Sequence, residues 1–313
     1  MSFSIDIQGQ GAHQIISLKD AQTGTVATFF SFGALLNSFK VHTSDGPLNV
    51  VDGFADPDDA IQHITAAFKS AKMSPFVCRL KNGCYQWNDE QLTVNSFFLG
   101  DHALHGLLYH AVYSIKDKGA DASSAWVKLE HHYEGTDKGY PFAYTLLIKW
   151  ELSARNCLTV TTTATNHSAN TIPFSDGWHP YFIASESVDD CTIKFNSDRK
   201  LVFDADLLPT GAEEKDDRFL NDRSLQGITL DNSFVLPNDE PGYCELKSKQ
   251  VRIIVEPLLH YPYLQVYTPE HRKSIAIENL SSAPDAFNNG MELVQLHPGE
   301  PKQFKTRYRV EIL

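Results

Sequence analysis

Alternation of apolar and polar side chains with a period of two dominates the chain. In residues 304–313 (FKTRYRVEIL), apolar or aromatic side chains and Thr306 fall on alternate positions, and charged side chains fall between them. This is the pattern of a half-buried β-strand. Residues 158–166 (LTVTTTATN) and the N-terminal FSIDIQ repeat it. Further β-rich runs, separated by clusters of Gly, Asp, Asn and Pro, lie at 126–134, 145–153 and 252–259.

One segment has helical periodicity instead. Residues 56–71 (DPDDAIQHITAAFKSA) begin with an acidic first turn, as helix N-termini favour. Five apolar residues then recur at helical spacing and share one face, which predicts an amphipathic helix packed on the sheet: Ala60, Ile61, Ile64, Ala67 and Phe68.

Many short strands with turns between them, and a single helix, predict an all-β protein built as a large antiparallel β-sandwich or barrel. The chain shows no internal repeat of 20–50 residues, and it has no Pro-, Gly- or Ser-rich linker. We therefore expect residues 1–313 to form a single domain. The acidic segment 213–223 (EEKDDRFLNDR) is expected to be a solvated loop.

Charge and cysteine content narrow the class of protein. Thirty-nine acidic and 27 basic residues give a formal net charge of -12, which argues against nucleic acid or an anionic membrane as the partner. The N-terminus lacks the basic and apolar regions of a secretory signal, and no run of 18 apolar residues occurs. The five cysteines are scattered and form no CxxC pair, so we expect reduced thiols, neither a disulfide framework nor a zinc site, and a cytoplasmic location.

The stretch DGWHPYF, residues 176–182, places one histidine among four aromatic or cyclic neighbours. Aromatic faces bind sugar rings, and a dry surround changes the pKa of an imidazole. His179 is therefore a candidate for acid–base chemistry, with the aromatic residues around it expected to form the wall of a pocket. The alternative is a buried structural histidine hydrogen-bonded to a backbone carbonyl.

Several other polar residues stand among apolar neighbours. Glu278 follows Ile275-Ala276-Ile277, so we expect it at or near a strand end. Glu is rarely buried without a partner, and a salt bridge or an outward-facing position would also explain it. Three more residues share this setting and are candidates for the same site: Arg79, Asp231 and Gln265.

His105 precedes Gly106, which would allow a close approach of the backbone. His102 and His105 together could suggest a metal site. However, an isolated HxxH is a weak signal, and spacing identifies no further ligands. We therefore expect no bound metal.

These stretches together resemble the aldose 1-epimerase (galactose mutarotase) family over most of the chain. DGWHPYF is similar to the family's histidine motif, LDNSFVL to its aspartate motif and YLQVYTP to its glutamine motif. IENLSSAPDAFNNGMELVQLHPGE is similar to its glutamate motif and the tail that follows. FGALLNSFKV, SPFVCRLKNG and LHG match more loosely, and LVFDADLLPTG resembles the loop between the histidine and aspartate motifs.

The resemblance implies a galactose mutarotase-like supersandwich that interconverts the α and β anomers of a free aldohexose, such as galactose or glucose, without a cofactor. It implies His179 as the general acid and Glu278 as the general base. The monosaccharide is the expected partner, and the protein is expected to be a monomer or homodimer. Around the sugar hydroxyls the resemblance places four residues: Arg79, His105, Asp231 and Gln265.

Three positions depart from the family pattern. Cys78 stands where many members carry Asn before the arginine, His102 stands where Asn is expected before ALHG, and Glu278 is followed by Asn279 in place of the common Pro. These departures bear on the preferred sugar.

Three other functions remain open from the sequence. A mutarotase for phosphorylated hexoses would need an added cationic cluster. A glycosidase would use two carboxylates, with Glu278 and Asp231 as candidates. A non-catalytic sugar-binding protein is also possible, because a fold does not fix a function.

Overall fold

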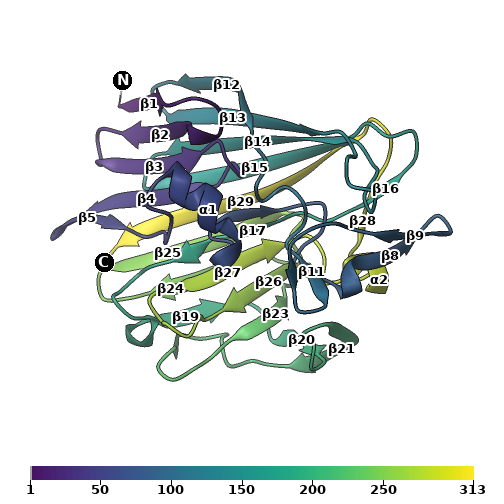
Figure 1. The fold of residues 1–313 in the computed structure, drawn as a ribbon. Coiled ribbons are helices and arrows are strands. Elements are labelled where there is room, and N and C mark those ends of the chain that lie inside the picture. Colours follow the sequence, from purple (N-terminus) through teal and green to yellow (C-terminus); the bar gives the residue numbers. More distant parts are fainter. Residues whose placement is uncertain (1) are drawn as a thin grey trace.

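The computed structural model describes residues 2–313. Its largest element is a nine-stranded antiparallel sheet that crosses the molecule (Figure 1). Its strand order is β12 (Ser114–Ala120), β13 (Ser124–Tyr133), β14 (Tyr144–Ser153), β15 (Cys157–Asn166), β29 (Pro301–Ile312), β25 (Val251–Leu259), β24 (Cys244–Lys247), β19 (Thr192–Phe195) and β22 (Arg223–Ser224).

A second, eight-stranded sheet carries the candidate residues. Its strand order is β21 (Pro209–Lys215), β20 (Arg199–Phe203), β23 (Asp231–Val235), β26 (Tyr263–Tyr267), β27 (Ile275–Leu280), β17 (Gly177–His179) and β6 (Ala71–Met73), and β18 (Tyr181–Phe182) also pairs with β27.

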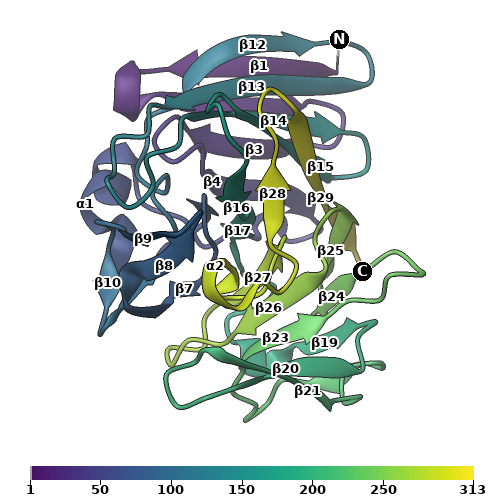
Figure 2. The ribbon, with the colours of Figure 1, turned by 90° about the vertical axis from the view of Figure 1, so that its right-hand side faces the viewer.

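A five-stranded sheet lies along one end of the nine-stranded sheet, where β1 and β2 contact β12–β14 (Figure 2). It consists of β1 (Phe3–Gln8), β2 (Ile15–Asp20), β3 (Thr25–Phe30), β4 (Leu36–Thr43) and β5 (Gly46–Asn49). The smaller sheets are β10 (Phe98–Leu99), β11 (His102–Leu104) and β7 (Arg79–Leu80); β8 (Cys84–Trp87) and β9 (Glu90–Thr93); and β16 (Ile172–Phe174) and β28 (Val294–Leu296).

The all-β sandwich predicted from the sequence is confirmed. In β29, Phe304, Thr306, Tyr308 and Val310 are buried as expected, although Ile312 at the strand end is exposed. The core between the sheets is aromatic at its centre. There Trp150 of β14 contacts Phe29 of β3, Trp178 of β17 and Tyr308 of β29, with ring centroids 4.8–6.4 Å apart. That residues 1–313 form one domain stays a prediction.

The predicted helix forms but is shorter than expected. α1 spans Pro57–Ala67, and the Asp56 side chain caps it by accepting a hydrogen bond from the backbone N–H of Asp59. Phe68 adopts a left-handed conformation and ends the helix. Ala71, the last residue of the segment expected to be helical, instead begins strand β6 (Ala71–Met73), and Ile61 is exposed rather than on the buried face. Besides α1, the structure has the one-turn helix α2 (Ala286–Asn289) and 3₁₀ turns at Gly11–His13, Lys81–Gly83 and Val188–Asp190.

The acidic segment also differs from the prediction. Residues 209–215 form the edge strand β21, whose side chains are mostly exposed, so this part is not a loop. Asp216 is buried and accepts two hydrogen bonds from the Arg218 guanidinium. Charged side chains on an exposed edge strand hinder pairing with another chain, so a strongly charged sequence is compatible with a strand here.

All five cysteines are free thiols. Among residues 2–313, no helix is both long and apolar enough to cross a membrane.

Candidate functional site

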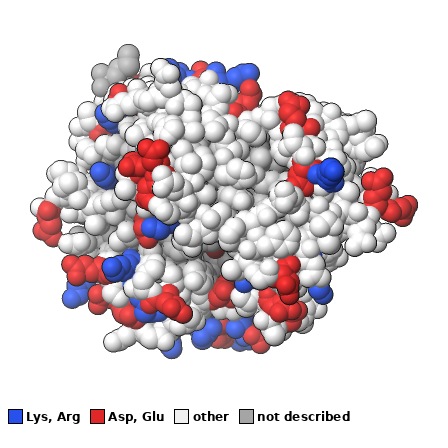
Figure 3. All heavy atoms as spheres, viewed as in Figure 1, with Lys and Arg blue, Asp and Glu red and all other residues white. Residues whose placement is uncertain are grey.

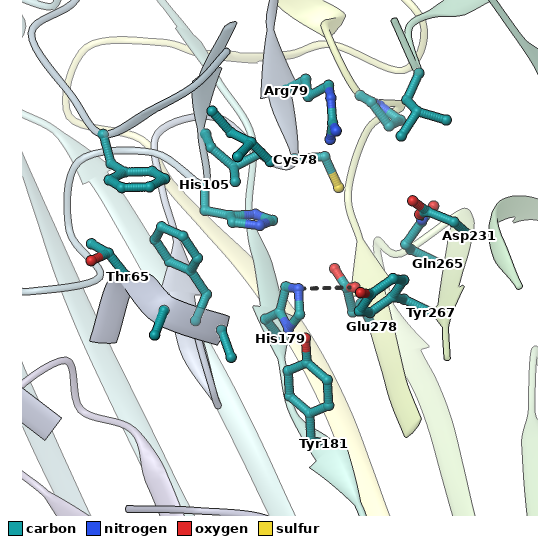
Figure 4. Close-up of a pocket in the computed structure, with 18 of the residues that line it drawn as sticks. Thr65, Cys78, Arg79, His105, His179, Tyr181, Asp231, Gln265, Tyr267 and Glu278 are labelled. Atoms are coloured by element: carbon teal, nitrogen blue, oxygen red, sulfur yellow. Dashed lines mark hydrogen bonds and ion pairs between the residues drawn. The ribbon is translucent and has the colours of Figure 1, made fainter. Parts of the chain in front are cut away.

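A cavity of about 280 Å³ lies over the face of the eight-stranded sheet and is also lined by the end of α1. This is near the lower end of the range for small-molecule sites, roughly 300–1,000 Å³. Figure 4 shows side chains from distant segments converging on it. All six candidate residues identified in the sequence line this cavity: Arg79, His105, His179, Asp231, Gln265 and Glu278.

Three neighbouring strands present their polar residues to the cavity by alternation. In β27, Ile275 and Ile277 join the core while Glu278 points the other way. Glu278 pairs in register with Gln265 of β26, and Gln265 pairs with Ser233 of β23. Glu278 is the fourth of six residues of its strand, two residues before the strand ends, and it is only 1% exposed, so the alternative of an outward-facing position is wrong.

Asn279, the residue that follows Glu278, faces the opposite side of the same strand. Its Nδ2 donates a hydrogen bond of 2.6 Å to Thr306 Oγ1 of β29. The asparagine therefore ties the two sheets together directly behind Glu278. A proline, which has no side-chain amide, could not make this contact.

The aromatic residues of DGWHPYF do not form the expected wall. His179 ends β17 and faces the cavity, but alternation turns Trp178 to the opposite side, where it packs on Trp150. Phe182 is fully buried against Tyr308. Besides His179 itself, only Tyr181 of this stretch lines the cavity, with its ring centroid 5.0 Å from that of His179.

The other aromatic walls come from parts of the chain that the sequence did not single out as site residues. Phe68 and Phe97 line one side, and Phe203 and Tyr267 also line the cavity. Phe68 was expected only as part of the buried helix face. The sequence gives no signal for its place in the cavity, because the predicted helix runs past Phe68, whereas α1 ends at Ala67.

His179 and Glu278 face each other inside the cavity. Nε2 of His179 lies 3.3 Å from Oε1 of Glu278 (Figure 4). The other polar atom of each side chain, His179 Nδ1 and Glu278 Oε2, is buried without a hydrogen-bond partner among residues 2–313. Buried polar atoms are nearly always hydrogen-bonded, so one unpartnered atom on each of these two facing side chains is typical of a site that a polar ligand completes.

Burial sets the protonation of this pair. Removal from water lowers the pKa of His179 to about 4. Burial, and then the charge of Asp231, raise the pKa of Glu278 well above its usual range. Both directions favour a neutral imidazole beside a protonated carboxyl over an ion pair, because each charged form loses hydration in the cavity. One proton is therefore shared by two groups whose atoms are nearly in hydrogen-bond contact.

Asp231 and Gln265 form a second polar group beside Glu278. Gln265 Nε2 donates a hydrogen bond of 2.7 Å to Asp231 Oδ1, and the Ser233 hydroxyl donates to Gln265 Oε1. Burial raises the pKa of Asp231, and the positive charge of Arg79 partly opposes this effect. The orientation of the Gln265 amide is thereby fixed by its neighbours on β23.

Arg79 and His105 reach the cavity from two paired strands, since Arg79 begins β7 and His105 directly follows β11, where Leu104 pairs with Arg79. The backbone N–H of His105 donates to the Cys78 carbonyl at 2.8 Å, and both of these residues have positive φ. A Cβ at Gly106 would lie 2.3 Å from the Ser74 carbonyl oxygen. The close backbone approach expected at this glycine is therefore confirmed.

The three departures from the family pattern occupy different places. Cys78 lines the cavity, whereas His102 does not. His102 Nδ1 instead accepts a hydrogen bond of 3.1 Å from the Asn82 backbone N–H.

His105 Nδ1 lies 3.0 Å from the Met73 sulfur. Within the described part of the chain, no three His, Cys, Asp or Glu side chains are grouped as a metal site requires.

Comparison with known proteins agrees with the architecture. Residues 14–309 match the model of the family described as aldose 1-epimerase. Two curated relatives, both from Escherichia coli (strain K12), are named only as uncharacterized proteins. YihR is 27% identical over 72% of this chain and 74% of its own, and YphB is 26% identical over 76% of this chain and 82% of its own.

Solved structures share the fold at lower sequence identity. A galactose mutarotase-like protein from Clostridium acetobutylicum superposes with a TM-score of 0.87 at 17% identity, covering 100% of this chain and 99% of its own. A galactose 1-epimerase from Lactobacillus acidophilus gives a TM-score of 0.84 at 20% identity, covering 99% and 98%. A GalM/aldose epimerase homologue from C. elegans gives 0.80 at 20% identity, covering 93% and 97%.

Proposed function

Because the chain belongs to the aldose 1-epimerase family, we propose that it interconverts the α and β anomers of a free aldose, with Glu278 as general base and His179 as general acid. The observation that supports this most directly is the contact of 3.3 Å between His179 Nε2 and Glu278 Oε1, at two buried side chains that each keep one polar atom unpartnered.

Anomer exchange needs two proton transfers at adjacent atoms. The base removes the proton of the C1 hydroxyl while the acid protonates the ring oxygen, which breaks the C1–O5 bond and leaves an open-chain aldehyde. Rotation about C1–C2 then presents the other face, and the same two transfers run backwards to close the ring. Each well-placed transfer contributes on the order of 10²–10⁴ in rate.

The shared proton of His179 and Glu278 fits this cycle. The reactive form carries the proton on His179, and the direct contact with Glu278 allows it to form from the neutral pair. Ring opening moves a proton from His179 to the sugar and another from the sugar to Glu278. The opened state thus has a neutral imidazole and a protonated carboxyl, which is the distribution that burial favours. The cavity thereby stabilises the open-chain intermediate relative to the charged pair.

The remaining polar residues are proposed to hold the sugar while the aldehyde rotates. Asp231 and Gln265 offer fixed acceptors and donors on the Glu278 side. Arg79 places a positive charge near oxygen atoms that become negative during ring opening, and His105 stands beside His179 with ring centroids 4.8 Å apart. Both transfers are made by side chains of the chain itself.

Polarimetry tests the proposal. Freshly dissolved α-D-glucose or α-D-galactose should reach its equilibrium rotation faster with the protein than without it. Glu278→Gln and His179→Ala should each lower the acceleration by two orders of magnitude or more, with unchanged circular dichroism spectra. Absence of any acceleration over a panel of free aldoses would contradict the proposed function and would favour a sugar-binding protein on this fold.

The alternatives from the sequence are less well supported by the cavity. Among the described residues that line it, Arg79 is the one Lys or Arg, alongside two carboxylates. Figure 3 shows acidic and basic side chains interspersed on the viewed face, without a basic cluster of the kind that a phosphate group needs. A glycosidase would leave the close contact of His179 with Glu278 without a role, and it would hydrolyse disaccharides, which a mutarotase does not.

A further inference from the structure

The cavity has two chemically different sides, with His179 and Glu278 between them. In Figure 4, Asp231, Gln265 and Tyr267 lie beyond Glu278 on one side, and Thr65 and His105 lie on the other side of His179. The first side is polar, because Gln265 pairs in register with Glu278 and donates to Asp231.

The second side is mostly apolar. A series of rings leads away from His179: His105 at 4.8 Å between centroids, then Phe68 at 4.6 Å from His105, then Phe97 at 5.3 Å from Phe68. Leu104 belongs to the same buried hydrophobic cluster as Phe68, and Phe97 packs against that cluster. We call the following cavity-lining residues the apolar lobe: Thr65, Ala66, Ala67, Phe68, Phe97 and Leu104.

The proposed chemistry fixes which part of a sugar enters this lobe. With the C1 hydroxyl at Glu278 and the ring oxygen at His179, the C1–C2 bond and the bond from the ring oxygen to C5 lead away in opposite directions. C2 follows C1 and lies on the Glu278 side, towards Gln265 and Asp231. C5 follows the ring oxygen and lies on the His179 side, so the substituent of C5 points to the apolar lobe.

We infer that the preferred substrate is a 6-deoxyaldohexose, a sugar whose C5 carries a methyl group in place of a hydroxymethyl group. This inference rests on the proposed function. A methyl group packs against Phe68, Phe97 and Leu104 without losing hydrogen bonds. A hydroxyl at C6 would find few hydrogen-bond partners among these side chains, where Thr65 carries the one side-chain hydroxyl of the lobe. A phosphate at C6 would be disfavoured more strongly.

Matched sugars provide the first test. Mutarotation is measured for D-galactose against 6-deoxy-D-galactose and for D-glucose against 6-deoxy-D-glucose, with D-glucose 6-phosphate as a fifth substrate. We expect kcat/KM to be about tenfold higher for each 6-deoxy sugar than for its parent, within the range by which an apolar pocket disfavours an added hydroxyl. Equal or higher values for the parents, or for the phosphate ester, would overturn the inference and leave the mutarotase function standing. Acceleration of none of the five would overturn both.

A substitution in the lobe tests its role separately. Ala67→Ser adds one hydroxyl to the lobe with little added volume, so the ratio of kcat/KM between each 6-deoxy sugar and its parent should fall towards one. Ala212→Ser makes the same change on the exposed edge strand β21, away from the cavity, and should leave the ratio unchanged. An unchanged ratio in Ala67→Ser, in protein with a wild-type melting temperature, would show that C6 does not lie in this lobe.

Discussion

Lys72 and Asp176 form an ion pair with no solvent exposure beside the strand that carries His179. Lys72 Nζ donates to both carboxylate oxygens of Asp176 and lies 4.5 Å from the ring centroid of Trp178. The Tyr261 hydroxyl donates to the same carboxylate at 3.0 Å. Lys72 is on β6, whose pairing with β17 places His179 opposite Ala71.

Removing the lysine should destabilise the protein strongly. Lys72→Met leaves the buried Asp176 carboxylate without its cation, and breaking a buried pair in this way typically costs about 3–5 kcal/mol. Burial opposes both charges, since it lowers the pKa of Lys72 to about 8 and raises the pKa of Asp176. The free energy of unfolding in urea measures the effect.

The double variant Lys72→Met/Asp176→Asn is the matched control. It removes both charges, so it should recover a large part of the stability lost by Lys72→Met alone. A Lys72→Met protein that unfolds at the wild-type urea concentration would contradict the prediction, and so would a double variant less stable than the single one.

Buried His105 should make the stability depend on pH below neutrality. Burial, followed by the charges of His179 and Arg79, lowers its pKa well below the usual value. Below pH about 6.5 the unfolded chain therefore binds a proton that the folded protein does not, so stability is lost as the pH falls. At about 1.36 kcal/mol per pH unit, the loss from this group amounts to about 2 kcal/mol at pH 5.

His105→Gln should remove this share of the pH dependence. Urea unfolding at pH 7 and pH 5 should show a smaller difference in the variant than in the wild type, by about 2 kcal/mol. His42 is exposed on β4, and His42→Gln serves as the control that keeps the wild-type difference. Equal differences in all three proteins would show that His105 titrates alike in the folded and unfolded chains.

The strands and the polar site residues were predictable because each depends on local patterns. Period-two alternation identifies β15 and β29, and the family motifs contain Glu278, Gln265 and Asp231. The same alternation, applied to Trp178 and His179, would have predicted that they face opposite sides of β17. The expectation of an aromatic wall from DGWHPYF overlooked this rule.

The apolar lobe could not be predicted in the same way. Phe68 reaches the cavity because it adopts a left-handed conformation at the end of α1, and no glycine or asparagine marks that position. Phe97 precedes the two-residue strand β10, which is too short for a periodic pattern. Their contact joins segments 29 residues apart and is determined by tertiary packing.

The acid and the base are proposed to act in one concerted exchange. The loss of kcat in the double variant should therefore be smaller than the product of the two single losses. His179→Ala and Glu278→Ala should each lower kcat about 10²-fold or more. The double variant should be little worse than the poorer single variant, because each substitution already disables the shared step. Double-variant losses equal to the product of the single losses would indicate that the two residues act in independent steps.

Asp231 provides a separate test of the division between chemistry and sugar binding. Its carboxylate accepts a hydrogen bond from Gln265 and lies on the polar side of the cavity, where it is proposed to hold sugar hydroxyls. Asp231→Asn should therefore raise KM more than it lowers kcat, because the lost contact is the same in the ground state and the transition state. Its negative charge also contributes to the raised pKa of Glu278, so the variant should make Glu278 easier to ionise and leave proton removal intact. Measuring kcat and KM by polarimetry for galactose and for glucose distinguishes the two roles. A large fall in kcat with unchanged KM would mean that Asp231 acts in the transition state and that the two-residue mechanism is incomplete.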